Sequence, residues 1–559
     1  MKKFSYTSDI QIQELAAGKS GRAKHIEVAF DRSERIIMIY LITILLILLQ
    51  DTHQLSLPKF TSRRDFACIC MKNGPTKPKG MKGIGNEHIK NAGSRSNKGI
   101  VGADKSNNGG KPLEYDTLRS SAANFVKAMK YRSHDSNAGD ISREERAVIY
   151  ALLTLHTPAL PASLLASTVY SLGMFSQNTK TRMNLRDETR LLQAGVHLIA
   201  SQLSMYDAVS LVVGMARMQA QWGEICKDES LSYRLSNFLP SMDDRSVGDT
   251  VWAIGSMGAR WNELPKSLQY NIILALEREG LKLNSFALSS ALWSMAKMGA
   301  KWSYFSKELR QNFITRAMEL GPLMSPQQSS KLVWALGTMG STFDEYPEFL
   351  LEYHVINVGK IKRSQVGFAV SASQTLTGVA KTGINWDKMS VLMRTSLLDQ
   401  LMRVCQSNND RGIANGVWAM GTIGLPMASL PEEIKDLMLL SSANIMKECS
   451  SWAFCNIIWG LAKMKFVWND LPRSFKDAII LNTKRIEKEM NNVDVGILIW
   501  SLGALDTPLD TLPADFVEAL LLAALRNLET MRAQELARTI WGLSGSGLSW
   551  DSIPAPVRW

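Results

Sequence analysis

Apolar residues recur along this chain with the spacing of an amphipathic helix, and the same pattern returns every 41 residues. The tryptophans of this pattern stand 41, 41, 84, 41, 41 and 41 residues apart. They are Trp252, Trp293, Trp334, Trp418, Trp459, Trp500 and Trp541. The double step holds a degenerate copy with Thr377 in the tryptophan's place, and weaker copies are centred on Val213 and Tyr170. A fixed period kept over most of a chain is typical of a repeat array.

We number each repeat from this tryptophan, which we call position 0. Nine residues earlier stands a side chain of the type that caps a helix N-terminus. These residues are Asp243, Asn284, Ser325, Asn409, Ser450 and Asn491. From there to +5 the apolar residues follow the helical period, and the usual glycine at +6 suits a left-handed helix stop. Small residues at −4 and +3 predict that a neighbouring helix approaches this first helix closely.

A second helix is predicted in each repeat, with a polar cap at +10, as in Asn262 and Asp510, and a Leu-Pro pair in its first turn. Neither helix can bury its apolar residues alone, so stacked repeats must share one core. The fold class predicted is therefore all-α, an α-solenoid of about nine or ten two-helix repeats. We expect the tryptophan at position 0 to be a core residue in the seam between helices, because large aromatic side chains dominate buried area.

The polarity of the chain divides it into four segments. Residues 1–58 form a signal-like leader around the apolar run 36–49, and residues 59–112 are predicted to be a disordered basic transit or linker segment. Residues 113–164 are predicted to be a helical cap, and the repeat array covers 165–559. Arrays normally close with a polar cap, whereas this one ends in the first turns of a new helix, which favours an incomplete C-terminus.

The leader indicates an organelle. A signal-like core followed by a transit-like segment resembles the two-part leader of proteins sent to plastids, so a plastid is the first expectation and a mitochondrion the second. The alternative is a membrane anchor with a flexible linker, although the apolar run is short for a membrane span. Residues 1–110 contain 18 Lys and Arg against 9 Asp and Glu, whereas the remainder contains 46 against 43. Most of the net charge of +12 therefore belongs to the leader.

Candidate chemistry is absent from the sequence. Gly18-Lys19-Ser20 ends like a phosphate-binding loop, but Gln13 stands where that loop requires its first glycine. The six cysteines and seven histidines have neither metal-ligand nor disulfide-framework spacing. We therefore expect a protein that is not an enzyme, with no catalytic residue, metal, cofactor or small-molecule substrate.

Positions −7, −3 and +4 of the first helix lie on one face. Position −3 is mostly polar and varies between repeats, which favours a role in reading RNA bases for Ser210, Asp249, Ser290, Lys331, Gln374, Asn415, Asn456 and Arg538. Position +4 is often basic and never acidic, which favours phosphate contacts for Arg217, Lys297, Lys381 and Lys463. At −7, Phe286 and Trp452 are candidates for stacking on bases.

This face favours binding of single-stranded RNA, in which polar side chains meet base edges and cations follow the phosphates. The plainer alternative is an ordinary solvated helix face, which is also polar and variable. A second function, a protein-binding α-solenoid scaffold, is favoured by the nearly neutral charge of the array. A continuous positive groove would support RNA, and a mixed or apolar groove would support a protein partner.

The first helices also resemble a known repeat. The segments Leu292 to Gly299 (LWSMAKMG) and Val333 to Gly340 (VWALGTMG) are similar to the repeat core of octotricopeptide-like proteins, of FAST-kinase-like and RAP-domain proteins, and of the helical domain of the RNA-editing substrate-binding complex. The resemblance implies a role in RNA processing, stability, splicing, editing or translation in mitochondria or plastids, with protein partners in a ribonucleoprotein complex. The period is longer than is usual in these families, and no RAP domain is visible, so no nuclease activity is implied.

Overall fold

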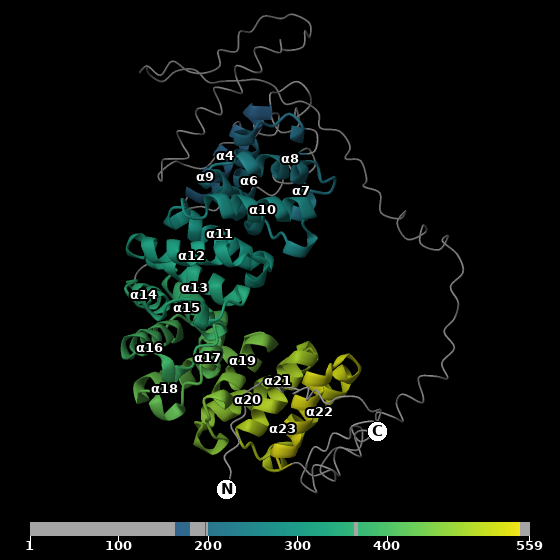
Figure 1. Cartoon of the computed structure of the whole chain (residues 1–559). Helices are drawn as coiled ribbons and strands as arrows, with labels where there is room; N and C mark the ends of the chain where they lie inside the picture. Colours follow the sequence, from purple (N-terminus) through teal and green to yellow (C-terminus); the bar gives the residue numbers. More distant parts are fainter. Residues whose placement is uncertain (1–161, 179–195, 197–198, 363–366, 548–559) are drawn as a thin grey trace, which may run out of the picture. The chain divides into compact units, whose positions relative to one another are not determined.

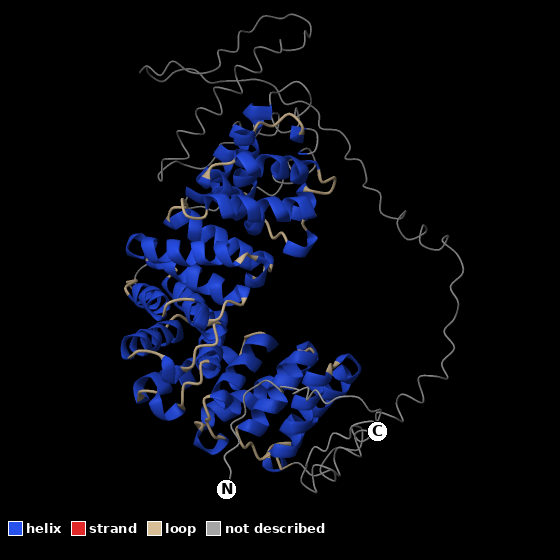
Figure 2. Ribbon diagram, in the orientation of Figure 1, coloured by secondary structure: helices blue, strands red, loops and turns tan. Residues whose placement is uncertain are grey.

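The computed structural model describes residues 162–178, 196, 199–362 and 367–547. These all belong to the compact unit Asn107–Trp559. The predicted leader 1–58 with its apolar run, the segment 59–112, nearly all of the cap 113–164 and the end of the array lie outside the described residues. The described part contains 19 α-helices and no strand (Figure 2), which confirms the all-α prediction. None of these helices is long and apolar enough to cross a membrane.

The helices form two layers, with ten described first helices in one and eight described second helices in the other; the remaining described helix, α7 (Trp222–Ile225), is a single turn that begins at +9 of the repeat of Val213. First helices pack against one another in sequence order (Figure 1). They are α4 (Ala162–Asn178), α6 (Met205–Arg217), α9 (Asp244–Ser256), α11 (Ser285–Met298), α13 (Pro326–Met339), α15 (Phe368–Lys381), α17 (Asp410–Thr422), α19 (Ser451–Lys463), α21 (Asn492–Ala504) and α23 (Ala533–Gly545). The second helices are α8 (Ser230–Phe238), α10 (Lys266–Glu279), α12 (Lys307–Leu320), α14 (Glu348–Gly359), α16 (Val391–Cys405), α18 (Glu432–Met446), α20 (Arg473–Ile486) and α22 (Ala514–Asn527). This arrangement confirms the α-solenoid.

Both ends of the first helices are formed as predicted. All six residues at −9 are N-caps whose side chains accept a hydrogen bond from a backbone N–H of the first turn. The glycines at +6 have φ between 73° and 84°, the left-handed conformation that glycine adopts without steric cost. Three repeats have Gln219, Lys465 or Asp506 there, at φ of 63°, 65° and 54°. The surrounding packing therefore imposes this stop even on residues that disfavour it.

The predicted cap at +10 is wrong. The second helices begin three residues later, and their N-cap positions are occupied by prolines such as Pro265 and Pro472 or by serines such as Ser306. The polar residue at +10 lies instead in a short 3-10 helix that begins at +9, for example Trp261–Glu263. The Leu-Pro pair therefore precedes the helix, because proline fits the extended backbone that enters it.

Position +9 ties each repeat to the next one. The tryptophans at this position, Trp222, Trp261, Trp302, Trp386 and Trp468, are 1–7% exposed. In several repeats the backbone N–H at +9 donates to the carbonyl oxygen at +5 of the following repeat, over 2.6–3.1 Å. These pairs are Trp222–Met257, Phe343–Thr382, Trp386–Ile423, Met427–Met464, Trp468–Leu505 and Leu509–Ser546. Adjacent repeats are thus joined by backbone hydrogen bonds as well as by apolar packing.

First helices approach one another through two small positions. The small residue at +3 packs against position +1 of the next repeat, and +1 is also Gly, Ala or Ser throughout the array. A Cβ atom on Gly421 would lie 2.7 Å from the carbonyl oxygen of Gly460, and one on Gly460 would lie 2.4 Å from that of Val417. These distances are shorter than a carbon–oxygen contact allows, so the close approach of the two backbones requires glycine here.

We expect Gly460→Ala to destabilise the protein by about 1–3 kcal/mol, as overpacking does. This reverses the usual effect, because alanine in place of glycine inside a helix normally stabilises by about 1 kcal/mol. Gly545→Ala is the control, since its added Cβ would meet only ordinary contacts of 3.6 Å or more. Urea unfolding of both variants measures the difference, and equal stability of the two would contradict the close approach.

Candidate functional site

The tryptophans at position 0 lie at the surface of the first-helix layer. Six of them are half-buried, and Trp541 is 49% exposed. Four of the half-buried ones pack against the core: Trp252, Trp334, Trp418 and Trp500. The expectation that position 0 is a core position is therefore wrong, and the buried tryptophans are those at +9. At 3.6 residues per turn, position 0 falls in the same stripe as −7, −3 and +4. We call these four positions of the first helices the open face.

Neighbouring tryptophans of the open face pack ring against ring in two runs, Trp293–Trp334 and Trp418 through Trp541, which together we call the tryptophan ladder. The ring centroids are 6.2 Å apart for Trp418–Trp459, 6.5 Å for Trp459–Trp500 and 5.8 Å for Trp500–Trp541, with interplanar angles of 24°, 40° and 28°. Trp293 and Trp334 form a further pair at 6.4 Å and 42°. Such pairs contribute about 0.5–1.5 kcal/mol each beyond their buried area, so the ladder stabilises the stacking of repeats.

All four residues predicted to contact phosphates lie over aromatic rings at position 0. In two repeats the cation covers the tryptophan of its own helix. The Nζ atom of Lys297 is 5.1 Å from the ring centroid of Trp293, and that of Lys463 is 5.7 Å from Trp459. The lysines follow the tryptophans by four residues, one helical turn, which is the spacing that brings the two side chains together.

The other two cations belong to the repeats that have no aromatic residue at position 0. Arg217 is in the repeat of Val213, and its guanidinium carbon is 5.4 Å from the ring centroid of Tyr170 and 5.7 Å from that of Trp252. Lys381 is in the repeat of Thr377, with Nζ 6.0 Å from the Trp334 ring. In both places the repeat has no tryptophan to pack on the ring of the preceding repeat, and the cation lies over that ring instead. Cation–π contacts of this kind stabilise by about 0.5–1 kcal/mol at exposed sites.

Three lysines on the open face have partly desolvated surroundings, although two of them, Lys297 and Lys381, are exposed. Burial lowers the pKa of Lys297, Lys331 and Lys381 below that of an ordinary lysine. Lys331 also lies over the ladder, with Nζ 5.7 Å from the Trp293 ring. Desolvation disfavours the charged form, and an anionic ligand favours it. A phosphate group placed beside these side chains would therefore offset the cost of their burial.

The predicted base-reading residues at −3 differ in accessibility. Six are half-buried on the open face: Ser210, Asp249, Lys331, Gln374, Asn415 and Arg538. Ser290 and Asn456 are 1% and 8% exposed, so these two predictions need correction. Ser290 is covered by its neighbours, and Asn456 folds back on its own helix, where Nδ2 donates to the carbonyl oxygen of Trp452 at 2.9 Å.

Two residues at −3 also link adjacent repeats, which the sequence did not reveal. Gln374 Oε1 accepts a hydrogen bond from Ser330 Oγ at 3.3 Å, and Asn415 Nδ2 donates to Ser373 Oγ at 3.4 Å. Each partner is the small residue at −4 of the preceding repeat. The predicted stacking residues are open to solvent, since Phe286 is 52% exposed and Trp452 is 42% exposed.

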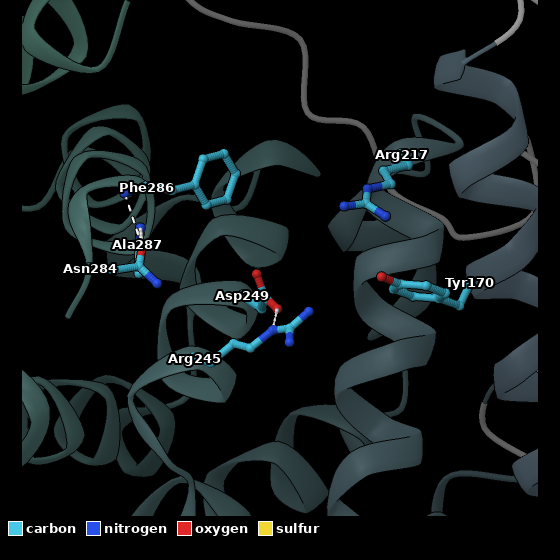
Figure 3. Close-up of a pocket in the computed structure, with 7 residues that line it drawn as sticks. All are labelled: Tyr170, Arg217, Arg245, Asp249, Asn284, Phe286 and Ala287. Atoms are coloured by element: carbon cyan, nitrogen blue, oxygen red, sulfur yellow. Dashed lines mark hydrogen bonds and ion pairs between the residues drawn. The ribbon is translucent and has the colours of Figure 1, made fainter. Parts of the chain in front are cut away.

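A cavity of about 270 Å³ opens on the open face over four successive first helices, α4, α6, α9 and α11. Its lining is Tyr170, Arg217, Arg245, Asp249, Asn284, Phe286 and Ala287. Figure 3 shows Phe286 on one side and Tyr170 with Arg217 on the other, with Asp249 and Arg245 between them. The fold therefore brings together a predicted phosphate contact, a predicted base-reading residue and a predicted stacking residue from three different repeats.

The charged pair in the middle of this cavity is loosely held. Arg245 Nε lies 3.8 Å from Asp249 Oδ2, and the arginine side chain is 79% exposed. Burial raises the pKa of Asp249, although the charges of Arg245 and Arg217 act in the opposite direction. The carboxylate is thus partly desolvated without a close donor from its ion-pair partner.

Thiol or metal chemistry finds no support among the residues that the structure describes. Their His, Cys, Asp and Glu side chains form no group that could hold a metal ion. Cys405 and Cys449 are buried, and burial raises the pKa of each thiol to about 11. Both thiols are therefore protonated at neutral pH, whereas the thiolate is the reactive form.

Comparison with known proteins places the chain in no family. No family model matches the sequence, and no curated protein matches it. Among known structures, the chain is similar to one in a homology model of the full-length AP-3 complex in an intermediate open conformation. That match has 11% sequence identity and a TM-score of 0.22, and it covers 77% of this chain and 94% of the other. A score this low supports no inference from that complex to this protein.

The two tryptophans of one repeat should differ in their contribution to stability. We expect Trp468→Ala to cost about 3–5 kcal/mol, because that ring is 4% exposed and its loss leaves a cavity. Trp459→Ala should cost clearly less, because that ring is only partly buried and its neighbours in the ladder can close over the gap. Thermal unfolding of the two variants measures this order, and an equal or larger cost for Trp459→Ala would make position 0 a core position.

Proposed function

We propose that this protein is a non-catalytic helical-repeat protein that binds single-stranded RNA along its open face. One observation carries the proposal. From the repeat of Tyr170 to that of Trp541, the open face holds eight Lys or Arg residues and a single acid, Asp249, beside the tryptophan ladder. The rest of the array must then be close to neutral or acidic, because residues 111–559 as a whole have 46 basic and 43 acidic side chains.

The asymmetry of charge favours RNA over a protein partner. A nearly neutral array is what a scaffold would have if its charges were scattered evenly. Here the basic residues gather on the same stripe as the exposed aromatic rings, which is the combination that binds single strands: cations follow the backbone and rings stack on bases. Four of the eight cations are lysines, a residue type that is depleted at interfaces with folded proteins, whereas arginine and aromatic residues are enriched there.

The geometry suggests how a strand would lie. The faces of the ladder rings are already occupied by neighbouring rings, so bases would contact only the exposed ring edges. Bases could stack on the more exposed rings of Phe286 and Trp452. Arg411 lies close to the second of these, with its guanidinium carbon 6.0 Å from the Trp452 ring. A lysine over a ring uses the electrostatic attraction of the ring face and keeps N–H donors for a phosphate. Binding would therefore need no rearrangement of the ladder.

The sequence supports two extensions of this proposal. The composition of the leader motivates an organellar site of action, a plastid first and a mitochondrion second. The resemblance to organellar repeat proteins motivates a role in RNA processing, stability, editing or translation, with partners in a ribonucleoprotein complex. Imaging of the full-length protein with a C-terminal fluorescent tag tests the first extension.

Filter binding of randomised single-stranded RNA over a salt series tests the proposal. We expect the triple variant Lys297→Gln, Lys381→Gln, Lys463→Gln to bind all sequences more weakly than the wild type. Its slope of log affinity against log salt should be shallower by about 2, because each phosphate contact of a single strand contributes about 0.7.

The control removes the same charge elsewhere. Lys301, Lys307 and Lys447 are exposed and lie outside the open face, and their replacement by glutamine leaves the net charge equal to that of the triple variant. The control should retain nearly all the affinity. Equal loss in both variants would show only a general charge effect, and no binding by the wild type at low salt would make a protein partner the better assignment for this face.

A further inference from the structure

We propose that the cavity between Phe286 and Tyr170 binds one guanine nucleotide of a single-stranded RNA, with Asp249 accepting hydrogen bonds from the guanine base. The inference rests on the proposed function, because it takes the open face to be the RNA-binding surface. It goes further in naming one base and one place in the array. The other repeats have no carboxylate on the open face, so this recognition occurs once.

The size and charge of the cavity limit what it can hold. About 270 Å³ is near the lower end of small-molecule sites, which measure about 300–1,000 Å³, and suits a single planar group with its sugar. Arg217 and Arg245 against Asp249 give the lining a positive balance. A cationic group such as an arginine side chain of a partner would be opposed by this balance, whereas a phosphate-bearing group would be attracted.

The carboxylate of Asp249 selects among the bases. An ionised carboxylate only accepts hydrogen bonds, and its two oxygens can accept from two adjacent donors. Guanine presents two adjacent donors on its Watson–Crick edge, the N1–H and the 2-amino group, whereas adenine, cytosine and uracil present one each. The raised pKa of Asp249 indicates a partly desolvated carboxylate, and two N–H donors would stabilise its charged form.

The aromatic side chains can hold the plane of the base. Phe286 is 52% exposed and lies on the side of the cavity opposite Tyr170 and Arg217 (Figure 3). Its backbone is fixed by the helix N-terminus, since Asn284 Oδ1 accepts from the N–H groups of Phe286 and Ala287 at 3.0 Å. Stacking of a base on such a ring is worth about 1–3 kcal/mol. The ring therefore supplies affinity, and Asp249 supplies selectivity.

The two arginines are placed for the sugar–phosphate backbone. Arg217 is held between the Tyr170 and Trp252 rings, and its Nη1 donates to Met174 Sδ. Its Nε is buried and has no hydrogen-bond partner among the described residues. Arg245 is mostly exposed and only loosely paired with Asp249, so it can turn to a phosphate while the carboxylate turns to the base. Arginine binds phosphate through its planar fork of donors.

Selection from a randomised single-stranded RNA pool tests this inference, using the full-length wild type, Asp249→Asn and the control Asp436→Asn. Asp436 is an exposed acid on α18, outside the open face. We expect the wild type and the control to enrich guanosine at one position, and Asp249→Asn to lose that preference. Inosine, which lacks the 2-amino group, should weaken wild-type binding about tenfold at that position, because one hydrogen bond to a charged acceptor is lost. The same change should have little effect on Asp249→Asn.

The outcomes separate this inference from the function on which it rests. RNA binding with the same base preferences in all three proteins would overturn the guanine site and leave the RNA-binding face intact. No RNA binding by any of them would overturn both. A third outcome is an unchanged RNA preference together with the loss of a co-purified protein partner in Asp249→Asn. That result would assign the cavity to a peptide and would also overturn the inference.

Discussion

The close approach of the first helices is the constraint on which the other features of this array depend. With only Gly, Ala or Ser at +1 and +3, the backbones of adjacent first helices meet with at most a small side chain between them. This proximity brings the tryptophans of successive repeats into stacking distance and lets the cation of one repeat reach a ring of another. It also lets the N–H at +9 reach a carbonyl oxygen of the following repeat. A larger side chain at +1 or +3 would push the helices apart and weaken the tryptophan stacking, the cation–ring contacts and the hydrogen bond from +9 together.

Local features of the fold could be predicted from the sequence because single residues determine them. A capping side chain at −9 and a glycine at +6 each act within one turn of their own helix, and the structure has both where they were expected. The start of the second helix was misplaced by three residues. There the chain forms a 3-10 turn from +9, whose N–H in several repeats donates to the following repeat, so the polar residue at +10 never becomes a cap. The start of the second helix therefore depends on packing between repeats, which cannot be predicted from the residues of one turn.

The open face was predicted in part. The helical period placed positions −7, −3 and +4 on one face, and it also places position 0 on that face. We nevertheless expected the tryptophan at position 0 in the core, because tryptophan side chains are usually buried. The signal that was missed is the second tryptophan nine residues later, which fills the core in its place. The two errors at −3 come from local packing, since Ser290 is buried between closely packed helices and Asn456 donates to its own helix. The joining of Arg217, Asp249 and Phe286 in one cavity needed the stacking of three repeats.

The tryptophan ladder also sets a pitch for any polymer that follows it. Within its two runs, rings of adjacent repeats are 5.8–6.5 Å apart, whereas stacked bases in a nucleic-acid strand are about 3.4 Å apart. A strand that advanced by one nucleotide per repeat would therefore be stretched to nearly twice its stacked rise, with every base separated from its neighbours. A duplex, whose rise is held by stacking, could not keep this register. Discrimination between single and double strands would then be a property of helix spacing and not of any one side chain.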